Sequence, residues 1–269
     1  MPSFPPWPFI PPWLAHNHGY YIEFSDVVSR NDGDACISCV THEAIVDVSG
    51  PLCIDVGADA GWWSLFCKQY APSSVIHAFE PNPARLEQLK TYTSDTFTFY
   101  NKAVSNTTST IRIEFNESNS HSRNNEGELV ETTTLDFILD SVPEVRVIKI
   151  DTEGHDIAIV RSLEPHFNRI HTLIFEFTVY WYGATKDESL QKSIDILELL
   201  CRHYPYVYIL CRNTSLRAFQ LCDTDNIIPI VTSLYTRHLQ VDIACTQNEL
   251  NSLEVMDENE LLGDFTLIW

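Results

Sequence analysis

From about residue 51 onward, short apolar runs alternate with segments that can form helices, and this alternation constrains the fold more than any other feature of the chain. The apolar runs are rich in valine, isoleucine and aromatic residues, which favour strands. Strands that are separated by helices usually pair in parallel, with helices on both faces of the sheet. We therefore predict an α/β fold with a mostly parallel sheet. The predicted strands lie at 52–56, 75–80, 96–100, 145–151, 172–177 and 206–210.

The helices between these strands carry clear boundary signals. Asn82 is a typical N-cap and Pro83 suits the first helical position, which predicts a helix over 84–92. Residues 187–204 form the clearest helix, because apolar residues recur on one face and Pro205 ends it. The remaining expectations are helices over 62–69 and 157–167, a seventh strand at either 240–244 or 265–269, and an irregular hairpin and loop over 105–134.

Two shorter segments precede this repeating pattern. Residues 1–20 contain six of the fourteen prolines and cannot form a regular helix or a central strand, so we expect a proline-rich N-terminal arm. Residues 21–50 are expected to form short strands that lead into the core. Residues 51–269 are then expected to form one main domain, which is long enough to bury a large core.

Charge and cysteine usage exclude several classes of protein. The 37 acidic and 17 basic residues give a formal charge of −20, which speaks against a nucleic-acid partner. No run approaches the ~20 apolar residues of a membrane-spanning helix, so no integral membrane segment is expected. Cys36 and Cys39 have metal or redox spacing, but no second pair follows and a chance spacing is favoured. Cys53 and Cys201 lie on apolar faces, as reduced thiols do, so we expect a cytoplasmic protein.

Four of the predicted strands deliver an acidic residue at or near their carboxyl end. These residues are Asp55, Glu80, Asp151 and Glu176. In an open α/β sheet, ligands bind beyond the carboxyl ends of the strands. A single acid at such a position would mean little, but four in sequence predict a binding site at this edge.

The first turn, Asp55-Val-Gly57-Ala-Asp59-Ala-Gly61, predicts which ligand binds there. Its glycines allow close approach of a ligand to the backbone, but it lacks the G-x-G-x-x-G spacing of dinucleotide-binding turns. Asp55 and Asp59 would repel a pyrophosphate, whereas they suit the sulfonium and ammonium groups of S-adenosylmethionine. Glu80 can accept hydrogen bonds from both hydroxyls of a ribose. The alternative is a structural turn with incidental acids.

Four segments of the chain together resemble the motifs of FkbM-type methyltransferases. They are Asp55 to Gly61, Phe79-Glu-Pro-Asn-Pro83, Thr134-Leu-Asp136 and Ile148-Lys-Ile-Asp-Thr-Glu-Gly-His-Asp156. The resemblance spans roughly residues 50–180, and the last motif is the most distinctive. It implies a class I methyltransferase fold, which is Rossmann-like with a seven-stranded sheet. It also implies methyl transfer from S-adenosylmethionine, usually to a hydroxyl oxygen.

Carried over by position, the resemblance assigns residues to each part of the cofactor. Asp55, Gly57 and Gly61 would line the methionine part, Glu80 would hold the ribose, and Asn101 to Ala103 would lie near the adenine. Two positions depart from the family pattern, because Asp59 stands where the family more often has Asn and Asp156 where it more often has Glu. The full set implied for cofactor binding is Asp55, Gly57, Ala58, Asp59, Gly61, Glu80, Pro81, Asn101 and Ala103.

The resemblance also places Asp151, Glu153 and His155 beside the methyl group. A hydroxyl acceptor has to lose a proton, and His155 is the preferred general base because its unperturbed pKa of about 6.5 suits that task. A histidine that is merely hydrogen-bonded into the turn is an equally open interpretation. Asp151 could instead hold the methionine ammonium group or, with Glu176, a divalent metal, although no metal is expected.

The acceptor is the least constrained part of the prediction. Tyr180, Trp181 and Tyr182 follow the fifth predicted strand, where an aromatic wall could receive a sugar or a lipid head group. The expected function is O-methylation of a hydroxyl on a small molecule, a glycan or a lipid-linked group. Two alternatives stay open, namely an NAD-dependent oxidoreductase and a non-catalytic binding module that retains the fold.

Overall fold

The computed structural model describes residues 50–59, 61, 63–64, 67–68, 71–90, 97–115, 120–122, 127–210, 217–221, 224–250, 254–257 and 261. The N-terminal arm, nearly all of the segment 21–50, the Cys36–Cys39 pair and the alternative strand at 265–269 lie outside the described residues. Predictions made for those parts stay predictions. None of the helices in the described ranges is long and apolar enough to cross a membrane.

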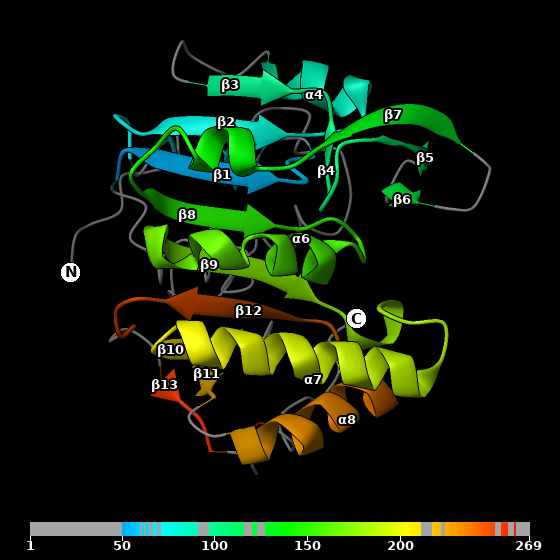
Figure 1. Cartoon of the computed structure of the whole chain (residues 1–269), viewed down its shortest axis with the longest axis vertical. Helices are drawn as coiled ribbons and strands as arrows, with labels where there is room; N and C mark the ends of the chain where they lie inside the picture. Colours follow the sequence, from blue (N-terminus) through cyan, green and yellow to red (C-terminus); the bar gives the residue numbers. More distant parts are fainter. Residues whose placement is uncertain are drawn as a thin grey trace, which may run out of the picture.

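A nine-stranded sheet runs through the centre of the described part of the molecule (Figure 1). Five neighbouring strands, β3, β2, β1, β8 and β9, run parallel, and β12 runs antiparallel to both of its neighbours, β9 and β10. β11 pairs antiparallel with β10 and parallel with β13. The spatial order is β3 (Phe97–Tyr100), β2 (Val75–Phe79), β1 (Leu52–Val56), β8 (Val145–Ile150), β9 (Ile170–Phe177), β12 (Val241–Thr246), β10 (Tyr206–Leu210), β11 (Arg217–Gln220) and β13 (Glu254–Val255).

This sheet confirms the predicted α/β fold but has two strands more than the seven expected. The additional strands are β11, which returns antiparallel beside β10, and β13, which extends the same edge. The central strands β1, β8 and β9 are almost completely buried, as expected of apolar runs covered on both faces. Of the two positions offered for a seventh strand, the first matches β12.

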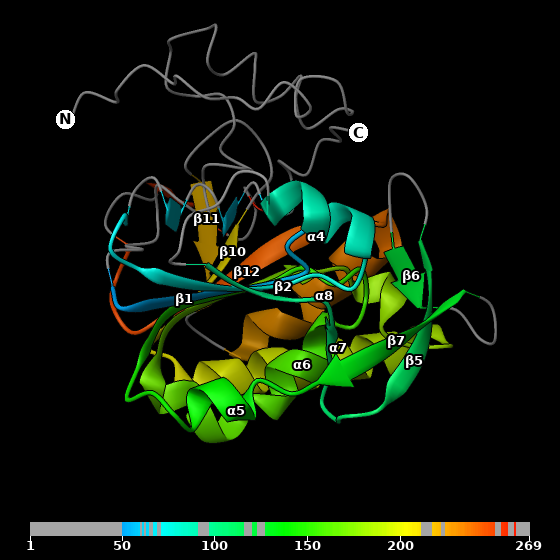
Figure 2. The same ribbon diagram turned by 90° about the horizontal axis from the view of Figure 1, so that it is seen from above.

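Helices cover both faces of the sheet (Figure 2). On one face α5 (Asp136–Leu139), α6 (Asp156–Ser162), α7 (Lys186–His203) and α8 (Ile227–Arg237) share the large hydrophobic cluster with the strands. On the other face lie α4 (Pro83–Lys90) and a short helical stretch around Trp63 and Cys67. Short 3₁₀ helices occupy Glu164–Arg169, Val179–Trp181 and Thr224–Asn226.

The boundary signals of the helices are confirmed where they were strongest. Asn82 Oδ1 accepts a hydrogen bond from the Ala84 N–H at 3.0 Å, and Pro83 is the first residue of α4. α7 begins one residue earlier than expected, capped by Thr185, and ends before Pro205. The helix expected over 157–167 instead ends at Ser162 and continues as a 3₁₀ turn that contains Pro165.

A second, four-stranded sheet lies beside the carboxyl ends of the central strands (Figures 1 and 2). The hairpin expected over 105–134 is present, because β5 pairs antiparallel with both β6 and β7, but it forms part of a regular sheet rather than an irregular loop. β5 and β7 pair antiparallel, and Ile113 and Val130 pack with Ala103 into a small core of their own. The order is β4 (Ala103–Val104), β7 (Glu128–Thr133), β5 (Thr110–Phe115) and β6 (Ser120–Ser122).

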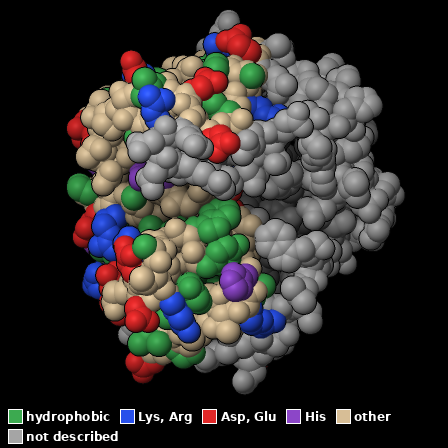
Figure 3. Space-filling model, turned by 90° about the vertical axis from the view of Figure 1, so that its right-hand side faces the viewer, with side chains coloured by type: hydrophobic (Ala, Val, Ile, Leu, Met, Phe, Trp, Pro, Cys, Tyr) green, Lys and Arg blue, Asp and Glu red, His purple; other side chains and the backbone are tan. Residues whose placement is uncertain are grey.

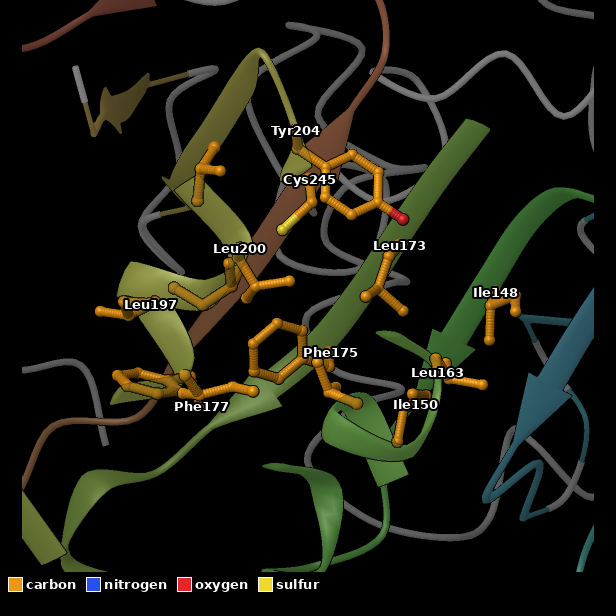
Figure 4. Close-up of a cluster of buried hydrophobic side chains, with 14 of the residues drawn as sticks. Ile148, Ile150, Leu163, Leu173, Phe175, Phe177, Leu197, Leu200, Tyr204 and Cys245 are labelled. Carbon is orange, nitrogen blue, oxygen red and sulfur yellow. The ribbon is translucent and has the colours of Figure 1, made fainter. Parts of the chain in front are cut away.

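The largest hydrophobic cluster lies between the central sheet and the helices α6, α7 and α8 (Figure 4). Phe175 and Phe177 on β9 meet Leu197 and Leu200 on α7, and all four side chains are at most 1% exposed. Burying an apolar side chain of this size contributes about 1.5–3 kcal/mol. This packing fixes β8 and β9, and therefore the edge at which the acidic residues emerge.

Candidate functional site

The carboxyl ends of the parallel strands meet at one edge of the central sheet, on the right-hand side of Figure 1. Figure 3 faces this edge and shows a hollow across its middle, with hydrophobic side chains on the lower border. The register places Gly57, Asp151 and Glu176 in successive strands at the same level, one residue beyond the Val56–Ile150–Phe175 row. The acidic residues predicted at this edge therefore do gather there.

The first turn is pressed against its two neighbouring strands. The Gly57 and Ala58 N–H groups both donate to Phe79 O at 3.0 Å, which ties the turn to the end of β2. Gly57 has a φ of +74°, and a Cβ added there would lie 1.7 Å from the Asp151 carbonyl oxygen. Only glycine combines this backbone conformation with so close an approach. The Gly61 N–H closes the turn on Ala58 O.

Glu80 is held by backbone groups on both sides. Its Oε2 accepts from the Asp59 N–H at 2.8 Å and its Oε1 from the Asn82 N–H at 2.7 Å. The side chain is buried, and burial is the main cause that raises the Glu80 pKa to about 7. Asn101 donates from Nδ2 to the carbonyl oxygens of Glu80 and Pro81, at 3.0 and 2.9 Å. The predicted ribose and adenine segments are thus in contact with each other.

Asp55 and Lys149 form a buried ion pair on the face of the sheet that carries α4. The Lys149 Nζ lies 3.8 Å from Asp55 Oδ1, 3.3 Å from Asp151 Oδ2 and 3.4 Å from Gly57 O. Ser64 Oγ donates to Asp55 Oδ2 at 2.5 Å. Burial raises the pKa of Asp55, whereas the pKa of Lys149 is raised by Asp151 and Asp55 against the opposing effect of burial. Lys149 therefore pairs with acids on both neighbouring positions of the edge.

A row of acidic side chains continues from this pair across the sheet. Glu176 is 3% exposed and lies opposite Asp242, which is 4% exposed, in the register of β9 and β12. Side chains alternate between the two faces of a strand, so Asp55, Lys149 and Glu176 emerge on the same face. In the described ranges no three His, Cys, Asp or Glu side chains are arranged to hold a metal ion.

The turn after β8 is organised by Asp156 at the start of α6. Asp156 Oδ1 accepts from the N–H and the hydroxyl of Thr152, at 2.8 and 3.0 Å, and Oδ2 accepts from the Gly154 N–H at 3.0 Å. Burial is the main cause that raises the Asp156 pKa to about 7. Glu153 takes up a left-handed backbone conformation with a φ of +55°. Asp156 therefore shapes the turn that carries Glu153 and His155.

His155 lies in this turn at the N-cap position of α6 and is partly buried. Its Nε2 lies 3.0 Å from the Ser105 hydroxyl, which follows β4 in the second sheet. Burial lowers the pKa of the imidazole, so the ring is neutral at physiological pH. The sequence singled out His155 but not Ser105, because nothing local marks a serine 50 residues away as a partner.

The side chains of Asp59 and Tyr182 do not lie where the sequence predicted them. The Asp59 carboxylate is turned toward Arg85 Nε, 3.0 Å away, and its side chain is 57% exposed, so Asp59 meets Glu80 through its backbone N–H alone. The Tyr182 ring is buried, and its hydroxyl accepts from the Thr178 N–H and donates to Glu176 O. Tyr182 is therefore a core residue rather than part of an exposed aromatic wall.

Tyr180 and Trp181 remain at the edge of the site. Their rings meet edge to face at 5.7 Å, and the Tyr180 ring lies 5.2 Å from His238. A Cβ on Gly154 would lie 3.5 Å from Trp181 Cβ, so Trp181 packs directly against the turn that carries His155. We call Tyr180, Trp181 and His238 the aromatic group.

The chemistry of these residues fits a cationic cofactor with a ribose. Asp55 Oδ1 is buried and has no hydrogen-bond partner among the described residues, so it can accept from the ammonium group of a methionine moiety. Glu80, with its two oxygens fixed by backbone donors, retains lone pairs for ribose hydroxyls. Asn101 and Ala103 flank the same loop. The residues present therefore fit S-adenosylmethionine.

Comparison with known proteins agrees with this geometry. Residues 55–208, more than half of the chain, match the model of a family described as "Methyltransferase FkbM domain". No curated protein matches the sequence significantly.

Among solved structures, similar chains include precorrin-6y C5,15-methyltransferase from Geobacter metallireducens GS-15. It is 16% identical, with 62% of this chain and 70% of that chain covered and a TM-score of 0.36. Human methyltransferase-like protein 13 in complex with SAH is 14% identical, with 84% and 87% covered and a TM-score of 0.40. The family match covers the first turn, Glu80 and the turn after β8, and it decides between the three functions that the sequence left open. The chain belongs to the FkbM methyltransferase domain family, and it is an enzyme that uses S-adenosylmethionine as its cofactor.

Proposed function

We propose that this methyltransferase methylates a hydroxyl oxygen on a small molecule, a glycan or a lipid-linked group, with His155 as the general base. The proposal rests on the hydrogen bonding and the protonation of the His155 ring. Its Nε2 is engaged by Ser105, whereas no hydrogen bond joins its Nδ1 to any other group in the described ranges. Burial favours the neutral ring, which is the form that can take a proton.

A hydroxyl acceptor needs a base because its oxygen is a weak nucleophile until the proton leaves. When bound, S-adenosylmethionine supplies an activated methyl group and its own leaving group. The protein has to align the acceptor, exclude water and remove the hydroxyl proton. In this assignment Asp55 and Glu80 hold the cofactor, the turn at 152–156 positions His155, and the acceptor proton moves to His155 Nδ1.

Asp151 and Glu153 are assigned supporting roles rather than that of the base. The Asp151 carboxylate is already engaged in an ion pair, because the Lys149 Nζ lies 3.3 Å from its Oδ2. Asp151 keeps a side chain that is 36% exposed, so it can orient a cationic or hydroxylated ligand at the edge. Glu153 adjoins it in the same turn.

The acceptor is assigned to the side of the site that the aromatic group borders. Tyr180 and Trp181 are partly exposed, and Trp181 packs on the turn that bears His155. Aromatic faces bind the apolar faces of sugars and lipid head groups. The net charge of −20 argues against a polyanionic acceptor such as RNA.

The compartment is proposed from the cysteines. Cys53, Cys67 and Cys245 are buried in apolar clusters, where they behave as small hydrophobic side chains. A chain that uses cysteine in this way suits a reducing environment, so we propose the cytoplasm.

Calorimetry followed by an acceptor screen tests the proposal. We expect S-adenosylmethionine, but not NAD, to bind the wild-type protein and to lose affinity in the double variant Asp55→Ala, Glu80→Ala. Incubation with a radiolabelled methyl donor and a panel of hydroxylated small molecules, glycans and lipid-linked sugars then identifies the acceptor.

With that acceptor, His155→Ala should lower kcat by about 10²–10⁴-fold, which is the usual contribution of a general base. His171→Ala is the matched control, because His171 pairs with Glu144 near the opposite end of β9. A His155→Ala variant with full activity, or transfer of the methyl group to nitrogen or carbon only, would refute the proposal.

A further inference from the structure

Ser105 is a buried hydroxyl with a fixed position beside the proposed base. The residue is 7% exposed, and its N–H donates to Thr133 O at 2.8 Å, which anchors it to the second sheet. Its Oγ lies 3.0 Å from His155 Nε2 and 3.2 Å from Asn106 Oδ1. The Ser105 side chain therefore links the second sheet to the turn that carries His155.

The direction of these two hydrogen bonds follows from the single proton on a hydroxyl. A carboxamide oxygen can only accept, so the Ser105 proton is given to Asn106 Oδ1. The Ser105 oxygen is then left with lone pairs toward His155, and Nε2 must be the donor. In a neutral imidazole a protonated Nε2 leaves Nδ1 as the unprotonated nitrogen.

We propose that Ser105 is a positioning residue that holds His155 with Nε2 protonated, so that Nδ1 is the atom that receives the acceptor proton. The inference rests on the proposed function of His155 and deepens it by naming the atom and its partner. It also gives the second sheet a role, because β4 and β7 carry the serine to the turn after β8. Asp156 fixes the same turn from the other side.

The direction of the hydrogen bond can be read from the pKa of His155. If Ser105 accepts from Nε2–H, the protonated ring gains more from the bond than the neutral ring, because bonds to charged groups are stronger. Removing the hydroxyl then lowers the proton affinity of His155, by on the order of fivefold. If Ser105 instead donates to Nε2, the bond favours the neutral ring, and removing the hydroxyl raises the proton affinity.

The test is an NMR titration of the histidine rings in the isotopically labelled full chain, with His155 assigned through a His155→Gln variant. We expect Ser105→Ala to lower the His155 pKa and Ser105→Thr, which keeps the hydroxyl, to restore it. Ser109→Ala is the control, because Ser109 Oγ contacts Thr132 rather than His155. A raised or unchanged His155 pKa in Ser105→Ala would overturn the inference, as would a Ser105→Thr variant that titrates like Ser105→Ala.

Failure of this inference is separable from failure of the proposed function. Cofactor affinity is measured on every variant, and Ser105→Ala is expected to bind S-adenosylmethionine as the wild-type protein does. With the acceptor in hand, a fully active His155→Ala variant would refute His155 as the base. An inactive His155→Ala variant combined with an unchanged His155 pKa in Ser105→Ala would refute only the role of Ser105.

Discussion

Replacing Gly57 by alanine tests how closely the first turn has to approach β8. Gly57 has a φ of +74°, a left-handed conformation that costs about 1–2 kcal/mol for a residue with a Cβ. The added Cβ would lie 1.7 Å from the Asp151 carbonyl oxygen, so two backbone segments have to move apart. Overpacking of this kind typically costs about 1–3 kcal/mol. The sum is about 2–5 kcal/mol, a large share of the stability of an ordinary domain.

Urea denaturation measures this loss as a lower free energy of unfolding. Gly154→Ala is the matched control, because Gly154 also has a positive φ, +104°, but its Cβ would lie at an ordinary contact distance, 3.5 Å from Trp181 Cβ. The control therefore carries the backbone cost without the collision, and we expect it to lose less stability than Gly57→Ala. Equal losses in both variants, or a Gly57→Ala protein that unfolds at the wild-type urea concentration, would refute the reasoning.

Three further predictions concern the buried charges and the core. Because the Glu80 pKa is about 7, its carboxylate protonates as the pH falls. Calorimetry should therefore show that the wild-type protein binds S-adenosylmethionine about tenfold more weakly at pH 6 than at pH 8. The Glu80→Gln variant should bind weakly at both pH values. Equal wild-type affinity at the two pH values would contradict this prediction. Lys149→Met leaves Asp55 buried without its cation and should cost about 3–5 kcal/mol in urea denaturation, so a loss below about 1 kcal/mol would count against a buried pair. Tyr182→Phe removes the hydroxyl that accepts the hydrogen bond of the Thr178 N–H and should lower the free energy of unfolding by about 1–3 kcal/mol. The affinity for the methyl acceptor should stay unchanged. Weaker binding of the methyl acceptor at wild-type stability would instead show that Tyr182 has a role in the site.

The central strands and the best capped helix were predictable because their signals are local. A run such as 145–150 combines β-branched residues with burial on both faces, and Asn82 and Pro83 mark a helix start by their own chemistry. The acids of the site were predictable for a related reason, since they stand directly after such runs. Parallel pairing then brings Asp55, Asp151 and Glu176 to one edge without further information.

The remainder depends on contacts between residues that are distant in the sequence. The second sheet arises because β5 pairs with both β6 and β7, which a composition rich in Ser, Thr and Asn does not reveal. The helix α8 contains Pro229 near its start, which hides its periodicity. The outward turn of Asp59 depends on Arg85 in α4, and the buried position of Tyr182 depends on the backbone of β9. Each of these partners is known only once the chain is folded.

The place of β12 in the sheet has a consequence for the order in which the protein is assembled during synthesis. β12 lies between β9 and β10, although it follows both of them in the chain. Until residues 241–246 have emerged from the ribosome, β9 and β10 each present an unpaired edge, and such edges promote association with other chains. A nascent or truncated chain that ends before Val241 is therefore the form most in need of a chaperone. Completion of the sheet waits for residues 241–246 of a 269-residue sequence.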